Sequence, residues 1–136
     1  MYRRIANLRR LARAQIHRRE MAIAHVAALD GASRSLADEW NGLESQIERD
    51  ILSGMGCNAL AARRARTIAT RAISVEAELR AATTLARQAV WRAAAIERLL
   101  QRLSREEHRV ENRRELTSII EAHVARATQA PDKDFD

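Results

Sequence analysis

The fold is decided by residues 68–103, which read IATRAISVEAELRAATTLARQAVWRAAAIERLLQRL. Their apolar side chains recur in alternating steps of four and three residues, at Ile68, Ala72, Val75, Leu79, Ala82, Ala86, Ala89, Ala93, Ile96, Leu100 and Leu103. This spacing is typical of the seam of a coiled coil. Because the middle of the seam is alanine, we expect a second helix to approach it closely.

The second helix is predicted from residues 2–52, which contain no proline and keep helical spacing of their large apolar residues. The clearest part of that stripe is Val26, Leu29, Leu36, Trp40, Leu43 and Ile47. Upstream, a stripe that begins at Ile5, Leu8 and Ala12 is expected to drift through Ile16 and Ile23, because a 3.6-residue helix departs from a strict heptad. Since Trp40 lies on the stripe, we expect it to pack in the seam.

The two helical stretches are separated by Ser53-Gly54-Met55-Gly56-Cys57-Asn58. The glycines suit a helix C-cap and a chain reversal, and Asn58 is a candidate N-cap. Helices joined by a short loop run antiparallel. The predicted fold is therefore all-α, with two long helices forming an antiparallel coiled-coil hairpin in a single domain. It comprises helix one (2–52), the turn (53–58), helix two (59–128) and a frayed acidic tail (129–136).

Charge supports an antiparallel register in which residue i faces about residue 111 − i. Residues 30–52 carry a net charge of −4, and the residues that would face them, 59–81, carry +3. Helix two is longer than helix one, so we expect the segment 111–128 to overhang helix one, to fold back or to meet a partner.

The end of the hairpin away from the turn is basic, because residues 1–29 carry a net charge of +6 and residues 82–110 carry +3. This end includes Arg3, Arg4, Arg9, Arg10 and Arg13. Three interpretations are open: docking to an acidic protein surface, a solvated charged face, or binding to nucleic acid. Trp91 lies off the seam, so it is a candidate partner-binding residue, although it could equally cover the flank of the hairpin.

The sequence carries no pattern that indicates catalysis. Cys57 is the only cysteine, and the pairs His17–Glu20 and His108–Glu111 are too small to define a metal site. No phosphate-binding glycine motif is present, and two packed helices are expected to offer no concave pocket of ligand size. We therefore expect a cytoplasmic protein that is not an enzyme, has no metal or cofactor, and has no membrane-spanning segment.

Two short segments resemble the YscO/FliJ family of type III secretion export stalk proteins, from injectisomes or flagella. The opening, Met1-Tyr2-Arg3-Arg4-Ile5-Ala6-Asn7-Leu8-Arg9-Arg10-Leu11, is similar to the start of YscO-type proteins. The stretch Glu111-Asn112-Arg113-Arg114-Glu115, continuing through Ile120-Glu121-Ala122, looks like the C-terminal helix of FliJ. The length, the single hairpin and the glycine turn also match this family.

The resemblance implies a hairpin similar to the central stalk of rotary ATPases, with its open end in the pore of a hexameric export ATPase. It also implies contacts with the export gate protein and with export chaperones, at the cytoplasmic side of the inner-membrane export apparatus. On this reading Arg3, Arg4, Arg9 and Arg10 match the family's basic N-terminal helix, and Arg113, Arg114 and Glu115 match its charged C-terminal segment. The alternatives are a generic coiled-coil scaffold and a basic helical protein that binds nucleic acid.

Overall fold

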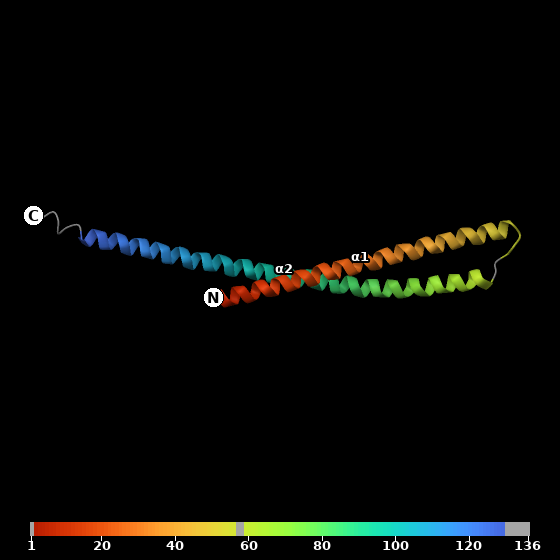
Figure 1. The fold of residues 1–136 in the computed structure, drawn as a ribbon, viewed down its shortest axis with the longest axis horizontal. Helices are drawn as coiled ribbons and strands as arrows, with labels where there is room; N and C mark the ends of the chain where they lie inside the picture. Colours follow the sequence, from red (N-terminus) through yellow and green to blue (C-terminus); the bar gives the residue numbers. More distant parts are fainter. Residues whose placement is uncertain (1, 57–58, 130–136) are drawn as a thin grey trace, which may run out of the picture. The chain divides into compact units, whose positions relative to one another are not determined.

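The computed structural model describes residues 2–56 and 59–129. Within these residues it contains two α-helices and no strand: α1 covers Tyr2–Leu52 and α2 covers Ala59–Gln129 (Figure 1). The helices pack against each other as an antiparallel hairpin, which confirms the predicted all-α fold class. The expected tail started at residue 129, but Gln129 is the last residue of α2, and the remaining tail residues lie outside the described residues.

The contacts of the chain divide it into two compact units, each built from a stretch of both helices. Unit 1 consists of Met1–Ala12 with Ala94–Asp136, and unit 2 consists of Arg13–Ala93. The sequence alone predicts one domain over the whole chain, because neither helix contains a break at these positions.

The turn at the end of α1 is a glycine cap, as the sequence predicts. The N–H of Gly54 donates to the carbonyl of Ile51 (3.1 Å) and the N–H of Met55 donates to that of Asp50 (2.9 Å). These are the two hydrogen bonds of a Schellman motif, whose central residue must adopt a left-handed conformation. Gly54 does so, with a φ of 80°, and Gly56 follows with a φ of 66°. The N-cap predicted at Asn58 lies outside the described residues.

The core of unit 2 is a small cluster of large apolar side chains from both helices. Leu36 and Leu43 of α1 are buried with Ile68 of α2. Ile47, Ala61, Ala65 and Val75 pack against this cluster. The pairing agrees with the register inferred from charge, in which residue 43 faces residue 68. Burying each such leucine or isoleucine contributes roughly 1.5–3 kcal/mol, so the cluster is the main apolar contribution to this unit.

The predicted drift of the α1 stripe through Ile23 is wrong. Ile16 is half-buried beside Gln15, but the covered positions then continue in steps of three and four through Arg19, Ala22, Val26 and Leu29, whereas Ile23 is 50% exposed. The strict heptads of α2 impose a supercoil that keeps one face of α1 toward it. In unit 2 the register places Arg19 opposite the alanine-lined part of α2, which leaves room for the apolar stem of a long side chain.

The seam predicted on α2 is confirmed at every position but one. Its eleven residues from Ile68 to Leu103 are buried or half-buried, except Ala72, which is exposed. The seam then continues to Glu107 and Val110, both half-buried. After Val110 every residue of α2 through Gln129 is exposed. We call this stretch, residues 111–129 of unit 1, the overhang.

Complementary charge does not produce ion pairs between the helices in the part of the chain that the structure describes. The ion pairs there join residues four apart within one helix: Asp30 with Arg34 of α1 (3.1 Å) and Glu76 with Arg80 of α2 (3.4 Å). All four side chains are largely exposed, so each pair contributes at most ~0.5 kcal/mol. The opposite charges of the two helices therefore favour the register at longer range and leave most charged groups available to partners.

Candidate protein-binding surfaces

The first surface is the arginine-rich start of α1 in unit 1. Arg3, Arg4, Arg9 and Arg10 are all exposed, because the heptad places Ile5, Leu8 and Ala12 toward α2 and leaves the arginines outside. Among the described residues, none of these four guanidinium groups lies within ion-pairing distance of a carboxylate. The start of α1 therefore presents four arginines with no ion-pair partner in the part of the chain that the structure describes.

Tyr2 fixes the start of α1 against α2. Its hydroxyl donates a hydrogen bond of 3.2 Å to a carboxylate oxygen of Glu111. This hydrogen bond, together with the negative charges of Glu111 and Glu107, raises the pKa of the Tyr2 phenol, while Arg114 acts in the opposite direction. The contact places the beginning of the overhang beside the arginine-rich start of α1 within the same unit.

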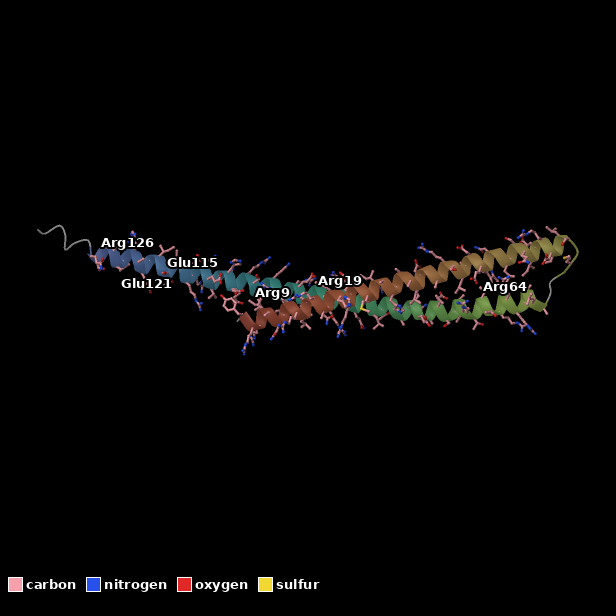
Figure 2. The ribbon with its side chains drawn as sticks, in the orientation of Figure 1. Arg9, Arg19, Arg64, Glu115, Glu121 and Arg126 are labelled. Atoms are coloured by element: carbon pink, nitrogen blue, oxygen red, sulfur yellow. The ribbon has the colours of Figure 1, made fainter. Side chains whose placement is uncertain are left out.

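The overhang carries the second group of predicted residues. Arg113, Arg114 and Glu115 are exposed at its beginning, and the carbonyl of Arg113 accepts a hydrogen bond from the hydroxyl of Thr117 (2.8 Å). Figure 2 labels Glu115, Glu121 and Arg126 along this stretch. Its arginines and glutamates are equal in number, so the overhang contributes alternating charge, whereas the start of α1 contributes only positive charge.

The overhang is also apolar along one side. Leu116, Ile119, Ile120 and Val124 are between 53% and 65% exposed. Their spacing of three and four residues places them on neighbouring turns of one face. No described residue of unit 1 covers them. Of the outcomes expected for this segment, folding back is excluded for the described residues, because α2 remains one helix to Gln129.

The remaining two predicted residues lie in unit 2. Arg13 is exposed, and Trp91 is 80% exposed, as its position off the seam predicts. Trp91 shares a surface hollow with Arg87, Gln88 and Arg92. The structure therefore groups seven of the nine predicted partner-binding residues in unit 1 and leaves these two in the other unit.

The expectation that two packed helices offer no concave site is wrong in unit 2. A groove of about 600 Å³ lies between α1 and α2, with Leu36 and Trp40 on one side and Ile68, Ala72 and Ile73 on the other. Trp40 is 42% exposed there, although its seam position predicts burial. One feature of the sequence is consistent with this groove: Trp40, the largest side chain of the α1 stripe, lies at the level of alanines on α2.

The described residues form neither a metal site nor a membrane-spanning helix. Among the described residues, no three histidine, cysteine or carboxylate side chains lie close enough together to hold a metal ion. Neither α1 nor α2 has, over its described residues, a stretch long and apolar enough to cross a membrane. Comparison of the chain with protein-family models, with curated proteins and with solved structures gives no match.

Proposed function

We propose that this protein is a central stalk of a type III secretion system, which binds a hexameric export ATPase through unit 1 and links it to the export gate. The observation that carries the proposal is the composition of unit 1. An arginine-only surface on α1 and an uncovered helical segment with an apolar side lie next to each other, joined by the Tyr2–Glu111 hydrogen bond.

Such a surface suits a protein partner better than a small molecule. Exposed apolar side chains on a helix mark an interface, and arginines bind carboxylate groups in a planar, two-point arrangement. A pore formed by several ATPase subunits would surround the overhang on all sides, which fits a helix whose residues are exposed around its whole circumference. The resemblance of Met1–Leu11 and Glu111–Glu115 to export stalk proteins supports the same assignment.

The mechanism needs no catalytic group on this chain. Asymmetric contacts with successive ATPase subunits would favour one subunit state at a time and so couple nucleotide turnover to the position of the helix pair. Because the coupling is reciprocal, binding of the hairpin should alter the rate at which the ATPase turns over. On this proposal the protein acts on an enzyme and promotes protein export without catalysing a reaction itself.

The test is an ATPase assay with the purified secretion ATPase from the same genome. The wild-type protein should stimulate hydrolysis, and the variant with Arg3, Arg4, Arg9 and Arg10 changed to alanine should not, because loss of four arginine contacts weakens binding by more than ~10-fold. The matched control changes four exposed arginines of unit 2 to alanine, namely Arg63, Arg64, Arg66 and Arg71.

The control variant should stimulate the ATPase as the wild type does. If the wild-type protein leaves the ATPase rate unchanged, or if the two quadruple variants behave alike, the stalk proposal fails. In that case a general scaffold role would remain, with a partner that is recognised elsewhere on the hairpin.

A further inference from the structure

The groove in unit 2 continues along one flank of the hairpin. Beside the hollow of about 600 Å³ is a second one of about 220 Å³, and Trp40 lines both. The second hollow is bounded by Glu44, Ile47 and Glu48 of α1 and by Ala65 of α2. We call the two hollows together the Trp40 groove. It belongs entirely to unit 2, so it is a different surface from the one that the proposed function uses.

The groove exists because one layer of the seam is incomplete. Trp40 occupies a seam position between Leu36 and Leu43, and the register places it opposite the exposed Ala72. Ala72 carries only a methyl group, which is too small to cover an indole ring, and Trp40 remains 42% exposed. The ring is therefore only partly covered, and the small side chains of Ala65, Ala69 and Ala72 form the floor of the groove beside it.

The apolar surface of the groove has the geometry that accepts a third helix. Its lining residues recur about once per turn, from Ser33 to Glu48 on α1 and from Ala65 to Leu79 on α2. A span of this length is about 20 Å at 1.5 Å per residue, enough for about four turns of an added helix. Ile73, which is 70% exposed at the edge of the groove, would be covered by such a helix together with Trp40.

Charge on the rim defines the chemistry of the occupant. Glu44 and Glu48 stand one turn apart on the α1 rim, and within the described residues neither forms an ion pair. Glu76 on the α2 rim is already paired with Arg80 (3.4 Å). The open carboxylates are therefore on one side only, and they match basic side chains four residues apart on the facing side of an added helix.

We propose that the Trp40 groove is a docking site for an amphipathic helix of another protein. The helix would place large apolar side chains at helical spacing over the alanine floor, and arginine or lysine residues spaced four apart toward Glu44 and Glu48. Docking completes the seam layer at Trp40 and Ala72 and converts this part of the hairpin into a three-helix arrangement. Helices that bind in a groove through such spaced apolar anchors are a general mode of peptide recognition.

The experiment uses the full-length Trp91→Phe variant, in which Trp40 is the only tryptophan. The probes are synthetic helical peptides of four turns that contain no tryptophan. They carry leucine or phenylalanine anchors at helical spacing and arginines at positions i and i+4. A matched set carries glutamate in place of arginine. The arginine peptides should shift Trp40 emission to shorter wavelength in a saturable way, and the glutamate peptides should bind at least ~10-fold more weakly.

Three groove variants and one control in this background locate the binding. Ala69→Arg, at an exposed floor position, should abolish binding by adding bulk and positive charge. Glu44→Gln with Glu48→Gln should weaken binding about three- to tenfold, as expected for two exposed ion pairs. Ile73→Ala should weaken it by a similar factor, whereas the control Ile23→Ala should not, because it changes another exposed isoleucine of the same unit that lies outside the groove.

Several results would overturn the proposal. One is the absence of a saturable emission shift with every arginine peptide, and another is unchanged binding to the Ala69→Arg variant while circular dichroism shows that it is folded. Equal loss of binding in the Ile23→Ala and Ile73→Ala variants would indicate general adhesion to apolar side chains. A self-associated protein that buries Trp40 before any peptide is added, detected by sedimentation, would assign the groove to a second copy of the chain instead.

Discussion

Two apolar stripes of this chain have similar helical spacing but differ in whether they are buried. In unit 2, Leu36 and Leu43 are buried against Ile68 of the other helix. In the overhang of unit 1, Leu116, Ile120 and Val124 follow comparable spacing and remain more than half exposed. The comparison teaches that periodicity predicts a helix with an apolar side, whereas burial depends on whether a second helix faces that side.

The largest expected effect comes from truncating a leucine in each stripe. Leu43→Ala should lower the free energy of unfolding by about 2–3 kcal/mol, because it leaves a cavity among the few large side chains of the cluster. Leu116→Ala should change it by less than about 0.5 kcal/mol, because the side chain is exposed in the folded chain. Urea denaturation followed by circular dichroism measures both values.

The result for Leu116→Ala could contradict this comparison of the two stripes. A cost above about 1 kcal/mol for Leu116→Ala in the isolated protein would mean that the overhang has a partner already, such as another copy of the chain. Repeating the measurement over a range of protein concentrations separates these cases, since the stability of an associated form depends on concentration.

A smaller effect on the free energy of unfolding is expected from substituting two glycines, one inside α1 and one in the turn. Gly42 lies inside α1, where an added Cβ meets nothing within 4 Å, so Gly42→Ala should raise the free energy of unfolding by about 0.5–1 kcal/mol. Gly54 has equal space but a φ of +80°, so Gly54→Ala should lower it by about 1 kcal/mol. Thermal unfolding of the two variants beside the wild type gives both signs, and the same sign for both would contradict the assigned helix end.

The smallest expected effect is on the pKa of Tyr2, which contacts α2 where the overhang begins. Tyr2 is the only tyrosine, and its hydrogen bond to Glu111 raises its pKa in the folded chain. Folding therefore favours the neutral phenol. The resulting contribution to the free energy of unfolding is fully present below the ordinary tyrosine pKa of about 10, and it is lost as the pH rises through the raised pKa of the folded chain. Ultraviolet absorbance of the phenolate follows the titration.

Glu111→Ala should return the Tyr2 pKa toward its ordinary value, because it removes both the hydrogen-bond acceptor, which is the largest cause of the shift, and the negative charge of the same residue. The control Glu115→Ala, which changes the next glutamate along the overhang, should leave the titration nearly as it is in the wild type. Equal shifts in both variants would show that general negative charge, and not the hydrogen bond, determines the pKa.

Much of the fold follows from the sequence because it depends on local rules. The alternating steps of four and three from Ile68 to Leu103 specify the seam, and the pair Gly54 and Gly56 specifies the turn. The path of the α1 seam through Gln15 and Arg19 was not predictable from apolar residues alone. It depends on the supercoil that the partner helix imposes, and on the space that alanines leave for long polar side chains.

The candidate surfaces follow from the sequence only in part. The exposure of the arginines at the start of α1 was predictable, since they fall between the heptad positions of Ile5, Leu8 and Ala12. The Trp40 groove was not predicted, because Trp40 satisfies the heptad and its exposure depends on the small side chain of Ala72 across the seam. Such a mismatch becomes visible when the register is known and the two side chains of each layer are compared.

The distribution of aromatic residues provides each unit with its own optical reporter. Tyr2 belongs to unit 1, and Trp40 and Trp91 both belong to unit 2. Tyrosine emission from the unlabelled protein therefore follows the contact at the start of α1, and tryptophan emission follows unit 2. Recording both during one denaturant titration would show the order in which the two units unfold, without a label or a substitution.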